Sequence, residues 1–180
     1  MPSNFTAPEI RRLLELLESE LASRGTAATM YVVGGAAIAL SFDTNRSTKD
    51  IDATLVPEGA VLEAARAVAE AEHLPPDRIN SDAAAWTPVL PKGALRAPNR
   101  AGLQVVVASP ESLLAMKLVA SRNRDIPDIK LLAEAIGLKD PVALANLVRD
   151  QYGDDQLEAV PGGYEDVLVW CRTLSSQLWP

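Results

Sequence analysis

The chain has 180 residues, of which 48% are hydrophobic and 4% aromatic, and its formal net charge is −7. This length favours one domain, or one domain with a small appendage, and the single cysteine, Cys171, excludes an intramolecular disulfide and a cysteine-rich zinc site. The negative charge argues against nucleic-acid binding by the whole surface, and the lack of a membrane-spanning apolar run or a signal core predicts a cytoplasmic protein.

The first part of the chain alternates between helix and strand patterns. Thr6 followed by Glu9 predicts a capped helix, which stops at Gly25. The elements expected after it, in chain order, are a strand over 29–33, a short helix over 35–42, a polar loop over 43–49, a strand over 50–56 and an amphipathic helix over 58–72.

The second part of the chain is dominated by helical patterns. Residues 73–101 are rich in proline and carry no firm assignment, whereas the composition of 102–108 predicts a buried strand. From Ser109 onward, helices are expected near 110–121, 125–136, 141–151 and 164–178. Strands first and helices later predict an α+β fold, with a small mixed sheet flanked by helices over 1–109 and a C-terminal helical bundle over 110–180.

Residues 33–52 carry the pattern with the most chemical content. Gly34 and Gly35 follow an apolar run, so a phosphate can approach the backbone closely, and the helix after them offers free N–H groups. Asp50 and Asp52 are two residues apart on the expected strand, which places both carboxylates on one face. Neighbouring acids repel each other unless a cation lies between them, and Mg²⁺ prefers carboxylate and phosphate oxygens. The pattern predicts an NTP site with Mg²⁺ on both aspartates; an ordinary tight turn and solvated acids on an edge strand are the alternatives.

This block resembles the signature of the nucleotidyltransferase superfamily, the polymerase-beta-like fold. In that superfamily a Gly-Gly or Gly-Ser turn holds the triphosphate, and an Asp-x-Asp strand binds the metals. The stretch from Arg46 through Thr48 to Asp52 is similar to one branch, the AbiEii/MenT-type toxins and their small relatives. The resemblance implies that Arg46 and Thr48 contact nucleotide phosphate or metal, and a solvated loop is the alternative.

A second block, residues 114–132, is similar to later motifs of the same branch, a Lys on one helix and an Arg-Asp-x-x-Asp on the next. It implies that Lys117 stabilises negative charge on the triphosphate, and that Asp125 or Asp128 orients Lys117, binds metal or accepts the nucleophile's proton. Arg124 would share a stripe with Lys117 on a continuous helix, which predicts a nucleotide contact. The alternatives are a lysine that reaches solvent and acids that cap a helix.

Two further observations bear on the resemblance. A third likeness spans residues 74–80, where small relatives carry Trp at the position of Arg78. The superfamily usually places a third carboxylate on a later strand, and the best candidate strand, 102–108, offers only Gln104. A neutral amide is a weak substitute for a metal-binding carboxylate, so this departure puts catalytic activity in doubt.

The resemblance implies transfer of a nucleotidyl group from an NTP to an acceptor. In the MenT-type branch the acceptor is the 3′ end of tRNA, and the enzyme is a toxin paired with an antitoxin protein. A small-molecule or protein hydroxyl as acceptor, and a catalytically weakened binding or regulatory protein, are the alternatives. An RNA acceptor is expected to bind a local basic patch drawn from five cations: Lys92, Arg96, Arg100, Arg122 and Arg124. The alternative is that these charges serve only solubility.

Overall fold

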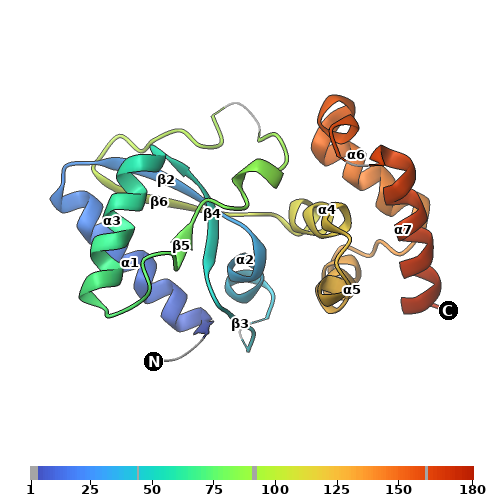
Figure 1. Cartoon of the computed structure of the whole chain (residues 1–180), viewed down its shortest axis with the longest axis horizontal. Helices are drawn as coiled ribbons and strands as arrows, with labels where there is room; N and C mark the ends of the chain where they lie inside the picture. The colour runs from blue at the N-terminus through green and yellow to red at the C-terminus, as the bar shows by residue number, and fades with distance from the viewer. Residues whose placement is uncertain (1–3, 44, 91–92, 161) are drawn as a thin grey trace. The chain divides into compact units, whose positions relative to one another are not determined.

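The computed structural model describes residues 4–43, 45–90, 93–160 and 162–180 (Figure 1). The chain divides into two compact units, Met1–Ala108 and Ser109–Pro180, next to the position where the strand patterns give way to helical ones. The first unit combines a small mixed sheet with helices and the second is helical, so the α+β class predicted from the sequence is confirmed.

The first unit is built on a four-stranded sheet in the order β5-β4-β2-β6. The two central strands are antiparallel, and each edge strand runs parallel to its central neighbour. The strands are β2 (Ala27–Val32), β4 (Ile51–Val56), β5 (Ile79–Asn80) and β6 (Gly102–Val107). A separate two-stranded ladder pairs β1 (Phe5–Thr6) with β3 (Ser47–Thr48).

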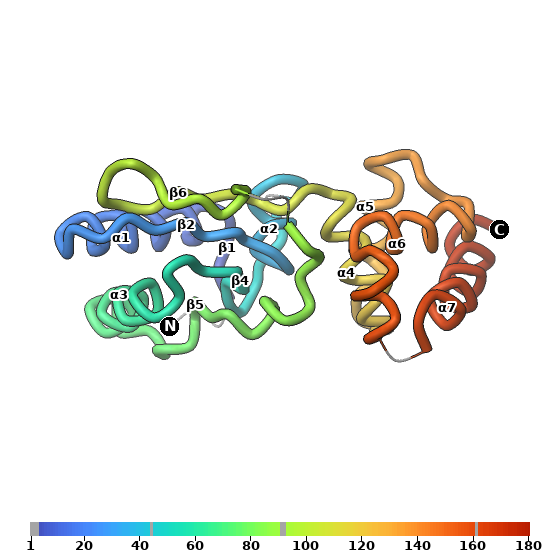
Figure 2. The backbone as a smooth tube through the Cα atoms, turned by 90° about the horizontal axis from the view of Figure 1, so that it is seen from above, coloured from blue at the N-terminus to red at the C-terminus, as the bar shows by residue number. Residues whose placement is uncertain are grey.

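The helices of the first unit bury the aliphatic side chains that the sequence patterns single out. These helices are α1 (Ala7–Ser23), α2 (Gly34–Ser41) and α3 (Glu58–Ala71). Helix α1 packs against β6 and lies beside α3, as Figure 2 also shows, while α2 packs against β4. The core of α1 consists of Ile10, Leu13, Leu14, Leu17 and Leu21, which repeat at helical spacing.

The burial predicted from the sequence is observed in strand β4 but not in strand β6. In β4, Ile51, Ala53 and Leu55 are buried while the residues between them are half-exposed, as the alternation predicts. The prediction that 102–108 is a buried strand is wrong. Because β6 forms the edge of the sheet, Gln104 is exposed and Val105 remains 38% exposed.

The second unit consists of helices α4 (Pro110–Ala120), α5 (Ile126–Ala135), α6 (Pro141–Glu158) and α7 (Gly163–Leu178), with a short 3-10 helix, η2 (Asn123–Asp125). Helix α4 packs against α5, α6 and α7, and α6 packs along α7. Helix α6 kinks at Gly153, whose φ of 74° lies outside helical geometry. In α7, burial raises the pKa of the Cys171 thiol to about 12, so this side chain is a core residue and not a nucleophile. Among the described residues, no helix combines the length and apolarity needed to span a membrane.

The predicted cap at the start of α1 generates a stability test. The Glu9 carboxylate accepts hydrogen bonds from the Thr6 hydroxyl at 2.6 Å and the Thr6 backbone N–H at 2.7 Å, and these bonds hold the pKa of Glu9 below its usual value. We expect Thr6→Ala to lower the free energy of unfolding by about 1 kcal/mol at pH 7, measured by urea denaturation.

The same cap predicts a pH dependence. A carboxyl whose pKa is lowered on folding contributes stability above its unfolded pKa and loses it as the pH falls through the folded value. The difference between wild type and Thr6→Ala should therefore shrink below about pH 4. Thr173→Ala, at an exposed position within α7, serves as the control without such a pH dependence. A constant difference from pH 7 to pH 3 would contradict this account of the cap.

Candidate functional site

The Gly34 turn and the Asp52 carboxylate lie against each other in the first unit. Strand β2 leads directly into α2, and Gly34 at the start of that helix has a φ of +62°, in the left-handed region that favours glycine. A Cβ on Gly34 would lie 3.1 Å from Asp52 Oδ2, and the Val33 N–H donates to the Asp52 backbone oxygen at 3.0 Å. The sheet pairing therefore holds the Asp52 carboxylate beside the turn.

Gly35 brings a second polar side chain, Thr48, to the same turn. A Cβ on Gly35 would lie 2.8 Å from Thr48 Oγ1, closer than real Cβ contacts allow. Helix α2 begins here without a side-chain cap, because Val33 occupies the N-cap position. Backbone N–H groups at such a helix start, together with the positive end of the helix dipole, are suited to an anion such as phosphate.

Asp50 lies just outside the strand on which it was expected. Strand β4 begins at Ile51, and Asp50 occupies the bend before it as a half-exposed residue. Asp52 is the half-exposed acid on the strand itself, separated from Asp50 by the fully buried Ile51. Within the described part of the chain, no group of three or more His, Cys, Asp and Glu residues has the geometry to hold a metal ion.

The polar neighbour of Asp52 in the sheet is Asn80, which the sequence did not single out. Asn80 on β5 pairs directly with Asp52 on β4. Gln104, the expected substitute for a third carboxylate, pairs instead with Thr29. Ala108 lies level with Asp52, and Gln104 lies four positions before Ala108, a distance of about 13 Å along the strand. Gln104 is therefore not the position that borders the Asp52 carboxylate.

Asn80 also organises the chain that follows it. Its Oδ1 accepts the Asp82 N–H at 3.0 Å and its Nδ2 donates to the Asp77 backbone oxygen at 3.4 Å. These bonds make a tight turn next to the Asp52 strand. The available signal was the position of Asn80 at the end of residues 74–80, the stretch with the third likeness.

In the second unit, Lys117, Asp125 and Asp128 form one buried ionic cluster. Lys117 Nζ lies 2.8 Å from Asp125 Oδ1 and 2.7 Å from Asp128 Oδ2. The side chains of Lys117 and Asp128 are only 12% and 1% exposed, so the lysine neither reaches solvent freely nor lies alone. The cluster links α4, η2 and α5, so it joins the lysine and the aspartates of the second sequence block.

Arg124 does not share a helical stripe with Lys117. Helix α4 ends at Ala120, and Ser121 adopts a left-handed conformation with a φ of 48°, so the continuous helix needed for that stripe does not form. Arg124 is exposed on η2, and Arg122 is exposed just before it. In the first unit, Arg46 is half-buried in the loop before β3.

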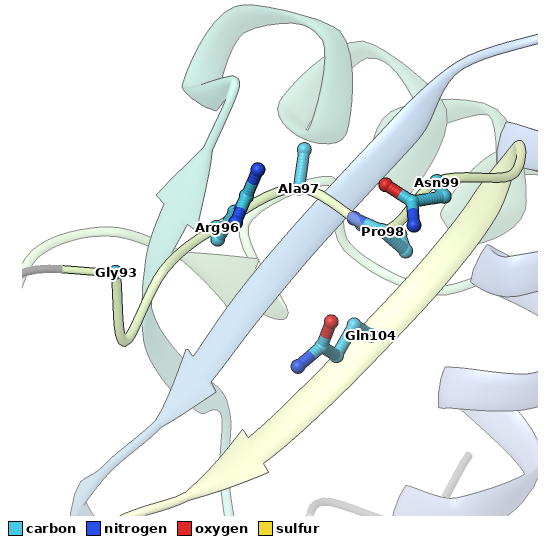
Figure 3. Close-up of a pocket in the computed structure, with 6 residues that line it drawn as sticks. All are labelled: Gly93, Arg96, Ala97, Pro98, Asn99 and Gln104. Carbon is cyan, nitrogen blue, oxygen red and sulfur yellow. The ribbon is translucent and has the colours of Figure 1, made fainter.

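The remaining cations of the expected basic patch have different surroundings. Arg100 pairs with Glu18 at 3.4 Å, which offsets its charge. Arg96 borders an open pocket of about 480 Å³ together with Gln104 and Asn99, and Figure 3 shows Gln104 extending from β6 beside that segment. Lys92 lies outside the described residues.

Comparison with known proteins identifies a family. The family model described as "Nucleotidyltransferase of unknown function (DUF6036)" matches residues 9–151, which include both the Gly34 turn with Asp52 and the Lys117 cluster. Searches of curated proteins and of solved structures each found no match.

The left-handed Gly34 is the basis of a stability prediction. Gly34→Ala forces a Cβ into the left-handed region and against Asp52 Oδ2. We expect it to lower the free energy of unfolding by at least about 1–2 kcal/mol, measured in urea. Gly59→Ala is the matched control, because a Cβ there meets nothing within 4 Å and the residue lies in helix α3. That control should be neutral or stabilising by up to about 1 kcal/mol; equal losses in both variants would contradict a specific constraint at Gly34.

The buried cluster also predicts how substitutions change stability. Lys117→Met removes the cation shared by Asp125 and Asp128, so we expect a loss of about 3–5 kcal/mol in the free energy of unfolding. Lys130→Met, at an exposed position of α5, should change it by no more than about 0.5 kcal/mol. Adding Asp128→Asn to Lys117→Met should recover part of the loss. The account fails if Lys117→Met is as stable as Lys130→Met.

Proposed function

The chain belongs to the family of nucleotidyltransferases of unknown function (DUF6036), and from that premise we propose that it transfers a nucleotidyl group from an NTP bound at the Gly34–Gly35 turn. An acceptor hydroxyl oxygen would bond to the α-phosphorus, and the bond to the β-phosphate would break with release of pyrophosphate. One observation supports this assignment above the others: the Asp52 carboxylate lies against a glycine turn at the uncapped start of α2. The helix start offers N–H donors to phosphate, and the adjacent carboxylate offers a ligand to a cation that accompanies phosphate.

The donor set at this turn fits Mg²⁺. Mg²⁺ is commonly bound by one or two carboxylates together with substrate phosphates and water, and Asp52 with Asp50 would supply the carboxylates. When bound, the ion would neutralise phosphate charge and help align the α-phosphate. Asp52 would hold its ligand position rigidly, because β4 pairs with strands on both sides. Thr48, whose Oγ1 borders Gly35, would contribute a hydroxyl to the triphosphate or metal, and Arg46 a cation.

We propose a separate role for the Lys117 cluster. Asp125 and Asp128 would hold Lys117 in position. By the resemblance of residues 114–132, Lys117 would supply positive charge for the triphosphate during transfer. Asp125, which is more exposed than Asp128, is the better placed of the two to accept a proton from an attacking hydroxyl. Arg124, exposed on η2, would add a nucleotide contact.

The acceptor proposed is RNA, with the 3′ end of tRNA as the specific case and a toxin–antitoxin setting as the biological role. This rests on the similarity of residues 46–52 and 114–132 to the AbiEii/MenT-type branch. Exposed Arg122 and Arg124 are the cations that support it, since Arg100 already pairs with Glu18. A small-molecule or protein hydroxyl would be the acceptor if RNA gains no label.

A second function is favoured by the missing third carboxylate. Asn80 borders Asp52, and Gln104 lies farther along the sheet, so neither position supplies a third acid. A nucleotide-binding regulatory protein with weakened catalysis would bind NTP with Mg²⁺ and transfer nothing. Binding and transfer therefore have to be measured separately.

The direct test is incubation with each α-labelled NTP, Mg²⁺ and total RNA, followed by identification of the species that gains label. We expect Asp52→Asn to reduce transfer at least about 100-fold, since it removes a charge that acts on the reacting phosphates. Urea denaturation without metal verifies that the variant is folded.

The matched control is Glu63→Gln, which removes one negative charge at an exposed position of α3. It should transfer label at the wild-type rate. Full activity in Asp52→Asn would refute the catalytic assignment, and wild-type protein that binds NTP without labelling any species would favour the regulatory function.

A further inference from the structure

Trp86 is an exposed aromatic side chain on a firmly anchored turn. It ends the short 3-10 helix η1 (Ala84–Trp86), and 58% of its surface is exposed. The next residue, Thr87, is only 7% exposed, and Pro88 is also buried. The chain therefore enters the protein interior immediately after Trp86. The exposed part of this indole offers planar aromatic surface to a ligand.

The turn that carries Trp86 is held by hydrogen bonds on both sides. The Ala84 N–H donates to the Ser81 oxygen at 2.9 Å, and the Trp86 N–H donates to the Ala83 oxygen at 3.0 Å. The Thr87 hydroxyl also donates to the Ala83 oxygen, at 2.9 Å. Ser81 in turn donates to the Glu58 carboxylate at the start of α3. The backbone of η1 is thus fixed before any ligand binds, which lowers the entropic cost of using its side chain in recognition.

The short helix η1 lies next to the strand that carries Asp52. Asn80 pairs with Asp52, and η1 begins four residues after Asn80 and packs against β4, the strand that carries Asp52. Figures 1 and 2 show this yellow-green turn at the end of the sheet where β2 leads into α2. The base of an NTP is separated from its triphosphate by the ribose. A residue that contacts the base is therefore expected on an element near the phosphate site, such as η1, and not in the Gly34–Gly35 turn itself.

We infer that Trp86 is the stacking platform for the nucleobase of the NTP, an inference that rests on the proposed function. The planar indole covers one face of the base while the Gly34–Gly35 turn holds the phosphates. Stacking on an aromatic side chain accepts every base, because every base has a π-face. The site should therefore accept all four NTPs, with tighter binding of the larger purines.

The test separates base recognition from phosphate recognition. ATP and inorganic tripolyphosphate, each with Mg²⁺, are titrated by calorimetry into wild type and Trp86→Ala. We expect Trp86→Ala to raise the Kd for ATP about 5- to 150-fold, which corresponds to about 1–3 kcal/mol of stacking. The Kd for tripolyphosphate should not change. Trp86→Phe, which keeps a smaller ring, should fall between wild type and Trp86→Ala for ATP.

Fluorescence gives a second readout in the same proteins. ATP should quench part of the tryptophan emission of wild type, and this quench should be lost in Trp86→Phe. Trp179→Phe, at the end of α7, is the matched control and should keep the quench. Thermal melting verifies that each variant is folded, which the exposure of Trp86 leads us to expect.

The outcomes distinguish this inference from the proposed function. If wild type and Trp86→Ala bind ATP equally, the stacking role is overturned while the nucleotide site stands. If Trp86→Ala weakens tripolyphosphate as much as ATP, Trp86 shapes the site without recognising the base, and the inference is again overturned. If wild type binds neither ATP nor tripolyphosphate, the proposed function fails and the inference fails with it.

Discussion

The close approach of Asp52 to the Gly34–Gly35 backbone is the constraint on which the rest of the first unit depends. Asp52 and Thr48 come so near the turn that neither glycine has ordinary room for a Cβ. This proximity requires β2 and β4 to pair in one register, with Val32 opposite Ala53, because a shift of one residue would turn Asp52 to the buried face. It also requires α2 to lie tightly against the sheet. Ala36, Ala37 and Ala39 are buried and small enough to allow this.

The second unit meets a different constraint, the burial of one cation with two carboxylates. Lys117 Nζ lies 2.8 Å from a carboxylate oxygen of Asp125 and 2.7 Å from one of Asp128. Burying these ions has a desolvation free energy that offsets much of their mutual attraction, so replacing the whole cluster by hydrophobic residues would change stability little. Removing Lys117 alone is costly because it leaves the acids without their cation. Their geometric demands are strict, however, because Lys117 must reach acids on η2 and α5 at the same time. The cluster therefore constrains the path of the chain from α4 through η2 to α5.

The sequence predicted those features that depend on local pattern. The alternation of Ile51, Ala53 and Leu55 was sufficient to place the Asp52 strand, and Thr6 with Glu9 was sufficient to start α1. Strand β5 was not predictable, since two residues contain no period and their role depends on pairing with β4. The importance of Asn80 was hidden for the same reason.

Two other differences between the sequence-based expectations and the structure also arise from tertiary contacts. The valines of β6 predicted burial, but composition alone does not distinguish an edge strand from a central one. The motif around Lys117 led to the expectation that an aspartate orients this lysine, whereas the left-handed conformation of Ser121 was not indicated by the sequence.

The edge position of β6 has a consequence for solubility. Within the described residues β6 is the last strand of its sheet, so one side has no strand partner, and its Val105–Val107 run has high β propensity. An uncovered edge of this kind can nucleate aggregation by adding strands from other molecules. Several features oppose this: β6 is only six residues long, Gln104 interrupts its apolar surface, and the Arg100–Glu18 pair places charges beside its start. The net charge of −7 adds repulsion between molecules, so the acidic composition that weakens general nucleic-acid binding also protects an exposed sheet edge.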